Sequence, residues 1–143
     1  MTATPSILVS VDGSPASDRA AAFAAKRAKA MPGTVIHLLN VQASMGNLVS
    51  SFVPKETIDA YRREEGAKAL ASAVRICTEA GVPFEKHIGV GRPGEVVGQF
   101  VKKLGAETVV TGTRGHGGVA GVLMGSVTQD IIAHVDVPIT LVK

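Results

Sequence analysis

The fold is decided first by residues 7–15, which read ILVSVDGSP. The short apolar run at the start of this stretch predicts a buried strand, and the Asp-Gly-Ser-Pro that follows predicts a sharp turn into a helix. Ser14 is a suitable N-cap, and Pro15 suits the first helical position because an N–H there would have no helical partner. Residues 7–15 therefore mark the start of a strand–helix unit.

This strand–helix alternation continues to the end of the chain. Strands are expected at residues 7–11, 35–41, 84–90, 108–111 and 137–143, and helices at residues 15–31, 55–80, 93–104 and 126–135. Such alternation favours parallel pairing with right-handed crossovers and helices on both faces. The third strand mixes polar with apolar residues, as is typical of a sheet edge. We therefore predict an α/β fold with a doubly wound five-stranded parallel sheet of order 3-2-1-4-5, in one domain spanning residues 1–143.

Three local expectations accompany this fold. The residues that should face the sheet from the first helix are mostly small and apolar: Ala20, Phe23, Ala24 and Met31. Residues 42–54 break the periodicity, so we expect a long loop that is a candidate lid. Cys77 falls on the apolar face of the helix at residues 55–80, where packing is its expected role.

Composition is that of an ordinary globular protein. Of the 143 residues, 45% are hydrophobic and 19% are charged, and no apolar run reaches the roughly 18 residues of a membrane span. The single cysteine and the lack of a recognisable N-terminal signal favour a cytoplasmic location. A net charge of +3, with only 3% aromatic residues and charges of alternating sign, argues against a nucleic-acid partner.

The predicted strand order brings two turns together. Ligands of doubly wound sheets bind at the carboxyl ends of the strands, where the direction of winding reverses. In this chain that position lies between Asp12, after the first strand, and Gly112, after the fourth. We therefore expect the ligand crevice between these two residues.

The strongest chemical signal is the stretch at residues 112–118, GTRGHGG, followed by Gly125 and Ser126 at the start of the next helix. Glycine-rich backbone presents several N–H groups to phosphate oxygens, and a helix N-terminus adds its positive end. Arg114 offers a charge-assisted contact. The pattern predicts an anion site, and a surface loop before a capped helix is the alternative.

Other nucleotide-binding and catalytic motifs fit less well. Residues 89–94, GVGRPG, match the dinucleotide pattern G-x-G-x-x-G, but they do not open the first strand–helix unit and no acidic residue follows at the required spacing. No Gly-Lys pair occurs in the chain, which excludes a P-loop. The third strand ends without the carboxylates of a phosphoacceptor site, and Ser126 is not in a G-x-S-x-G turn. We assign no catalytic residue and no protein ligand to a metal.

The spacing within the glycine-rich region resembles a known signature. Gly112, two residues, Gly115, nine residues and then Gly125-Ser126 is similar to the G-2x-G-9x-G-S pattern of the ATP-binding universal stress proteins. Three further stretches resemble the family's opening strand and turn, its fourth strand and loop, and its ending: residues 7–14 (ILVSVDGS), 109–115 (VVTGTRG) and 137–142 (VPITLV).

The resemblance implies roles for individual residues. Asp12 would lie beside the adenosine, and the backbone of Val41 would contact the adenine. The ribose and phosphates would be lined by Gly112, Gly115 and Gly125, with Thr113, Arg114, His116, Gly117, Gly118, Ser126 and Val127 around the phosphate chain.

The expected function is adenine-nucleotide binding, with ATP as ligand, in a regulatory or stress-response protein. Mg²⁺ would be held mainly by the phosphates, because the sequence offers no carboxylate cluster to chelate it. A slow ATPase or phosphotransferase that uses the same pocket is the alternative, and an interaction protein that binds no nucleotide is a third possibility. The last strand, residues 137–143, should be a sheet edge and, as the resemblance also implies, should pair with a second copy in a homodimer; a further protein partner stays open.

Overall fold

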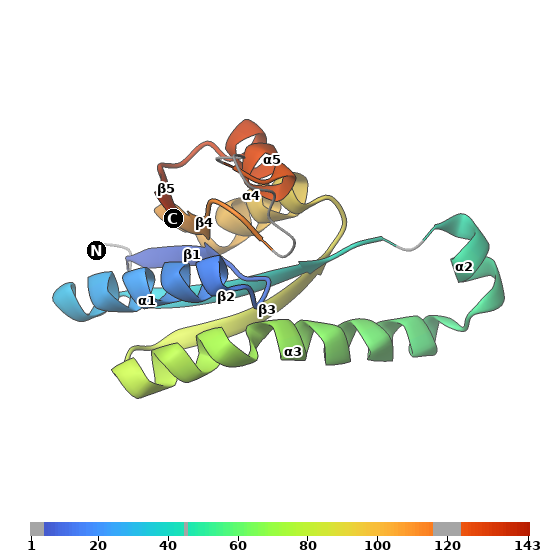
Figure 1. The fold of residues 1–143 in the computed structure, drawn as a ribbon, viewed down its shortest axis with the longest axis horizontal. Helices are drawn as coiled ribbons and strands as arrows, with labels where there is room; N and C mark the ends of the chain where they lie inside the picture. Colours follow the sequence, from blue (N-terminus) through green and yellow to red (C-terminus); the bar gives the residue numbers. More distant parts are fainter. Residues whose placement is uncertain (1–4, 45, 116–123) are drawn as a thin grey trace.

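A five-stranded parallel sheet forms the centre of the molecule (Figure 1). The computed structural model describes residues 5–44, 46–115 and 124–143. The strands are β1 (Ser6–Ser10), β2 (Val35–Gln42), β3 (Phe84–Val90), β4 (Thr108–Gly112) and β5 (Ile139–Val142). Their order is β3-β2-β1-β4-β5 and all four neighbouring pairs are parallel, which confirms the predicted topology.

Helices cover both faces of this sheet, as predicted. The helices of the described residues are α1 (Pro15–Ala30), α2 (Asn47–Phe52), α3 (Lys55–Ala80), α4 (Pro93–Leu104) and α5 (Ser126–His134). Figure 1 shows α3 below the sheet and α4 and α5 above it, and α1 packs beside α3 on the lower face. None of these helices is both long enough and apolar enough to cross a bilayer.

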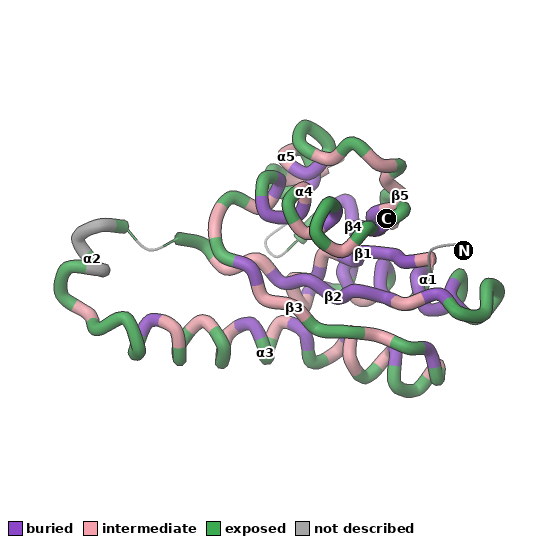
Figure 2. The backbone as a smooth tube through the Cα atoms, turned by 180° about the vertical axis from the view of Figure 1, so that it is seen from behind, coloured by how far each residue is buried: buried purple, intermediate pink, exposed green. Residues whose placement is uncertain are grey.

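The core has two layers because successive side chains of a strand point to opposite faces. Ile7 and Val9 of β1 pack with α1 and α3, whereas Leu8 packs with Val97 of α4 and Ile131 of α5. Figure 2 shows the resulting concentration of buried residues along the central strands, β1 and β2. The strand β3 at the edge is more exposed, which accounts for its polar sequence.

The start of α1 has the predicted cap, because the Ser14 Oγ accepts a hydrogen bond of 3.2 Å from the backbone N–H of Ser17. The face of α1 that is buried consists of small residues: Ala16, Ser17, Ala20, Ala21, Ala24, Ala25 and Ala28. Ala20 and Ala24 were predicted correctly, but Phe23 and Met31 are 38% and 42% exposed. The prediction was wrong for these two residues because α1 turns its alanine face toward both the sheet and the neighbouring helix α3.

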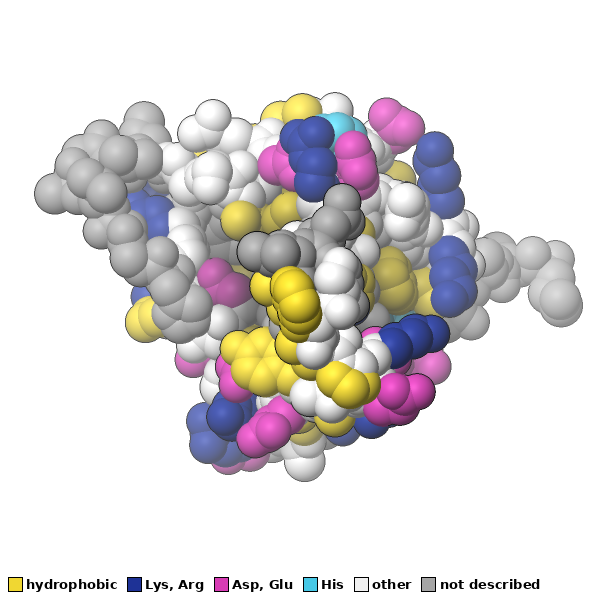
Figure 3. Space-filling model, turned by 90° about the vertical axis from the view of Figure 1, so that its right-hand side faces the viewer, with side chains coloured by type: hydrophobic (Ala, Val, Ile, Leu, Met, Phe, Trp, Pro, Cys, Tyr) yellow, Lys and Arg dark blue, Asp and Glu magenta, His cyan; other side chains and the backbone are white. Residues whose placement is uncertain are grey.

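The segment at residues 42–54 is not the uninterrupted loop that the sequence predicts. It contains α2, which ends at Phe52 because the residue before Pro54 disfavours the helical conformation. Figure 1 shows α2 at the far end of the molecule from the termini, away from the sheet. Figure 3 views that end, where hydrophobic side chains gather; Phe52 is 79% exposed and Tyr61 is 52% exposed. The role of this segment as a lid stays a prediction.

Local signals placed most element ends correctly. Gly81 and Gly105 end α3 and α4 in the left-handed conformation, with φ of 72° and 67°, which glycine adopts without steric cost. The last strand begins at Ile139 rather than at Val137, because the Pro138 nitrogen has no hydrogen to donate to the ladder. Cys77 is buried against the sheet, as expected for a packing role.

Candidate functional site

A cavity of about 270 Å³ lies at the carboxyl ends of β1, β2 and β4, beside the start of α5. This volume is close to the lower end of the roughly 300–1,000 Å³ of small-molecule sites. The predicted site residues that line the cavity are Asp12, Val41, Gly112, Arg114, Gly115, Gly125, Ser126 and Val127. Asp12 and Gly112 therefore share one cavity, as the strand order predicted.

The remaining predicted residues divide into two groups. Thr113 is buried and is not among the lining residues; its backbone N–H donates to the Val142 carbonyl at 2.9 Å, and its carbonyl accepts from the Gly125 N–H at 2.8 Å. Thr113 therefore links β4 to β5 and to the start of α5. His116, Gly117 and Gly118 lie outside the described residues.

Asp12 is held in a fixed turn at the end of β1. Its carboxylate Oδ1 accepts a hydrogen bond of 2.9 Å from the Ser14 N–H, and its own N–H donates to the Ser17 Oγ at 3.1 Å. The other carboxylate oxygen, Oδ2, points toward Gly115, because a Cβ built on Gly115 would lie 2.5 Å from it. The turn between β1 and α1 thus sets both the position of the acidic group and its closeness to the glycine-rich loop.

The cavity also has lining residues that the sequence analysis missed: Ser10, Val11, Ser17, Asn40, Pro93, Thr111 and Thr128. The buried Asn40 side chain donates to the Val11 carbonyl at 2.8 Å and accepts from the Gln42 side chain at 2.6 Å, so it joins the ends of β1 and β2. Thr128 Oγ donates to the Gly112 carbonyl at 2.8 Å and fixes α5 on β4. A polar residue at the end of a predicted buried strand was the available signal for Asn40.

The three glycines of the signature have different surroundings. A Cβ on Gly112 would lie 2.9 Å from the Cβ of Ala16 and 3.0 Å from the carbonyl carbon of Ala16, so α1 approaches β4 closely here. A Cβ on Gly115 would meet the carboxylate of Asp12. A Cβ on Gly125 would have no described atom nearer than 3.9 Å. Packing within the described protein therefore accounts for the first two glycines but not for Gly125.

The mouth of the cavity is suited to an anion. Arg114, Gly115 and Ser126 are exposed there, and the N-terminus of the nine-residue helix α5 begins at Ser126. Backbone N–H groups at a helix N-terminus point outward and carry partial positive charge. The described part of the mouth thus combines a cation, a hydroxyl and a helix end.

Comparison with known proteins now identifies the family. Residues 4–143 match the family model described as the Universal stress protein family. The chain belongs to the universal stress protein family. A universal stress protein of Methanocaldococcus jannaschii is 30% identical over 139 residues, which cover 96% of this chain and 81% of that protein. One from Thermus aquaticus is 31% identical over 138 residues, which cover 96% of this chain and 97% of that protein.

Solved universal stress proteins have the same fold. The structure from Lactobacillus plantarum is 20% identical and superposes with a TM-score of 0.78, each chain being covered completely. The structure from Archaeoglobus fulgidus in complex with dAMP is 26% identical, with a TM-score of 0.71 and complete coverage of both chains. The five-stranded sheet and its crossovers are therefore those of this family.

Proposed function

We propose that this universal stress protein binds ATP, or another adenine nucleotide, in the cavity between β1 and β4 and acts as a regulatory protein through that binding. The observation that carries the proposal is the open space at Gly125. Its backbone is extended, with φ of −75° and ψ of 168°, so its conformation does not require glycine. No described atom fills the place of its side chain either, and the nearest are in Arg114, Gly115 and Thr113. The missing side chain leaves room for a ligand between the loop and the start of α5.

The exposed groups around that space suit the phosphates. Arg114 would supply the positive charge, the Ser126 hydroxyl a hydrogen bond, and the backbone N–H groups of Gly115 and the start of α5 further donors. The nucleoside would enter the cavity toward Val41 and Asp12, as the family resemblance implies. The dAMP complex of the Archaeoglobus fulgidus relative supports an adenine nucleotide as the ligand class.

We also propose that Mg²⁺ accompanies the nucleotide through its phosphates. Among the described residues that line the cavity, Asp12 is the only carboxylate, and its Oδ1 already accepts a hydrogen bond from the backbone of Ser14. Mg²⁺ prefers six oxygen ligands and keeps several waters, so phosphate oxygens and water must supply most of them.

The test is the variant Gly125→Thr, measured by thermal unfolding with and without Mg-ATP. Threonine is about as good an N-cap as glycine, so the melting temperature without ligand should change little. At ATP about one hundred times above Kd, the wild type should gain roughly 2.7 kcal/mol. If the side chain weakens binding a hundredfold, the same ATP concentration stabilises the variant by only about 0.4 kcal/mol.

Gly46→Thr is a matched control. Gly46 is also an N-cap glycine with an extended backbone, φ −62° and ψ 158°, and has open space around it, but it does not line the cavity. This variant controls for the change in melting temperature without ligand that follows from replacing an N-cap glycine by threonine. An equal shift in the wild type and Gly125→Thr would reject this site, and no shift in the wild type at millimolar ATP would reject the proposed function.

We further propose that the protein is a homodimer joined through β5. This strand forms one edge of the sheet and pairs with β4 alone among the described strands. Its residues Ile139–Val142 include Leu141, which is 39% exposed. An apolar edge strand is open to pairing, and two-fold pairing would cover both copies with one self-complementary surface.

A further inference from the structure

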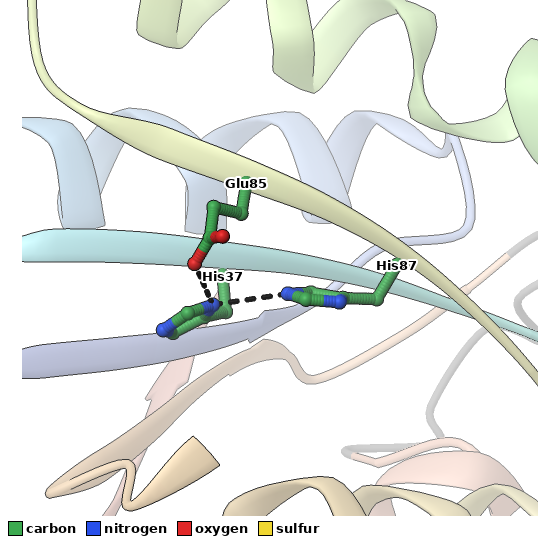
Figure 4. Close-up of side chains that lie close together, drawn as sticks. All are labelled: His37, Glu85 and His87. Carbon is green, nitrogen blue, oxygen red and sulfur yellow. Dashed lines mark hydrogen bonds and ion pairs between the residues drawn. The ribbon is translucent and has the colours of Figure 1, made fainter.

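Three side chains that can ligate a metal ion meet on the sheet outside the nucleotide cavity: His37 of β2, and Glu85 and His87 of β3. Figure 4 shows them pointing toward one another from the two neighbouring strands. In the β2–β3 register His37 pairs with Glu85 and Leu39 pairs with His87, so all three side chains lie on the face that α4 covers. His37 precedes Val41 by four residues on β2, which places the cluster roughly 13 Å from that end of the cavity.

The distances in the cluster are close to those around a bound ion. The Nδ1 of His37 lies 3.0 Å from the Nε2 of His87 and 3.3 Å from the Oε2 of Glu85. One ligand atom of each residue lies within 4.8 Å of the other two. Metal–ligand bonds of about 2.1 Å at tetrahedral angles separate neighbouring ligand atoms by about 3.4 Å. Two of the three separations therefore need to change by only a few tenths of an ångström.

The two histidines of the cluster are partly or fully buried, whereas the glutamate is exposed. His37 is only 6% exposed and pairs with Leu8 in the register of β1 and β2, on the face that carries the apolar cluster of Leu8, Leu39 and Val97. A polar ring in such a place is costly unless it has partners. The ring of His87 is 5.6 Å from that of Phe100 on α4, whereas the Glu85 side chain is 62% exposed. The two imidazoles are thus held by packing, and the carboxylate side is open to solvent for entry.

We propose that His37, Glu85 and His87 form a site for one divalent transition-metal ion, with Zn²⁺ as the best match. Imidazole nitrogens and carboxylate oxygen are ligands that Zn²⁺ commonly takes, and two histidines with one glutamate leave a fourth position for water or another small ligand. The single negative charge of Glu85 partly offsets the charge of the ion. Binding needs the lone pairs of His37 Nδ1 and His87 Nε2, so the proton that now joins them moves to the outer nitrogen of its own ring.

The charged groups around the cluster shift the pKa of His87 in opposite directions. Burial, followed by the nearby His37 ring, lowers the pKa of His87. Lys103 of α4 is the nearby positive charge; its Nζ lies 5.5 Å from the centre of the Phe100 ring. Glu85 is the negative charge that counters it.

The experiment is a Zn²⁺ titration of the full chain, without a histidine tag, after removal of metal and nucleotide, in competition with a chromophoric chelator. The wild type should bind one equivalent. His87→Gln should raise the Kd for Zn²⁺ at least tenfold because it removes a direct ligand, and Glu85→Gln should do the same at an exposed position that leaves the fold intact. His134→Gln is the matched control: its Nδ1 lies 3.3 Å from Asp130, but no third ligand joins them among the described residues.

The outcomes separate a metal site from an imidazole pair that serves packing alone. Loss of binding in the Glu85 and His87 variants, with wild-type Kd in His134→Gln, supports the site. A Kd within twofold of wild type in Glu85→Gln and His87→Gln overturns it, as does a wild type that binds less than one equivalent at 100-fold excess of free Zn²⁺ over the protein. Because no nucleotide is present, the result is independent of the proposed ATP site.

Discussion

Replacing Gly94 by alanine should disturb both the fold and the proposed nucleotide site, because α4 and α5 cross at this residue. A Cβ on Gly94 would collide with the carbonyl oxygen of Asp130 and lie 2.6 Å from its carbonyl carbon. Both atoms belong to the backbone of α5, so no side-chain rotation relieves the clash. The Gly94 N–H also donates to the Asp130 carboxylate at 2.7 Å, and Arg92 contacts the same carboxylate at 3.1 Å.

The magnitude follows from three effects. Overpacking costs about 1–3 kcal/mol, and separating the helices would weaken a hydrogen bond to a charged group, for which about 1.5–3 kcal/mol is typical. Alanine regains at most about 1 kcal/mol of helix propensity. We expect Gly94→Ala to lower the free energy of unfolding by about 2–4 kcal/mol, which at about 2–4 °C per kcal/mol lowers the melting temperature by roughly 5–15 °C.

Urea unfolding followed by circular dichroism measures this change, with Gly66→Ala as the control. Gly66 lies in α3, and its added Cβ would come 2.5 Å from Ile88 Cδ1 and 2.9 Å from Ile88 Cγ1, atoms of a side chain that can move and not of the backbone. Rotation of Ile88 costs about 0.5–1.5 kcal/mol, which the gain in helix propensity largely offsets. Gly66→Ala should therefore stay within about 1 kcal/mol of the wild type.

The proposed nucleotide site gives a second readout of the same change. α5 begins at Ser126, so a shift of α5 also displaces Gly125 from the loop at Gly115. The ATP-induced stabilisation should then fall in Gly94→Ala and persist in Gly66→Ala. If Gly94→Ala unfolds within about 0.5 kcal/mol of the wild type, the rigid backbone contact between α4 and α5 is refuted.

Four further predictions can be checked separately. Light scattering should give twice 14.7 kDa for the wild type and a monomer for Leu141→Pro, which loses a ladder donor; a wild-type mass near 14.7 kDa at micromolar concentration would contradict the dimer. The wild type should produce ADP from ATP at a steady-state rate far below the roughly 10 s⁻¹ of a median enzyme. A rate of several turnovers per second that is lost in His116→Ala would show an enzyme instead. Burial raises the pKa of Cys77 to about 11, so alkylation at pH 8 should be slow in the native protein and fast in urea; equal rates would contradict the burial. The hydrogen bond from Gly94, and then the charge of Arg92, lower the pKa of Asp130, so this carboxylate stabilises the fold above the unfolded pKa of about 3.9, and the stabilisation is lost as pH falls. Asp130→Asn should therefore be less stable than the wild type at pH 7, and the difference between their free energies of unfolding in urea should be smaller at pH 3.

Much of the fold could be predicted because its signals are local. Apolar runs and the turn at residues 12–15 specify a strand followed by a helix, and Gly81 and Gly105 specify helix ends, whatever the rest of the chain does. The polar sequence of β3 identified an edge, and the edge then constrained the strand order. The order in turn placed Asp12 and Gly112 in one crevice, so the main position of the candidate site was also predictable.

Helix orientation and the rest of the cavity were not predictable in the same way. Phe23 was expected in the core, but the packing of α1 against α3 selects the alanine face and leaves this ring partly exposed. Asn40 and Thr128 line the cavity from β2 and α5, which are far apart in the chain. A short stretch of sequence cannot predict that these two residues line the same cavity, because their positions depend on how two crossover connections return to the sheet.

The sequence by itself therefore determined most of the elements, their order in the sheet and the position of the candidate site at the ends of β1 and β4, since each rests on periodicity or turn chemistry within a few residues. Only the tertiary structure decided which distant side chains meet. His37 and His87 are 50 residues apart and face each other through the β2–β3 register. A slip of one residue in that register would turn one side chain of the pair to the opposite face of the sheet.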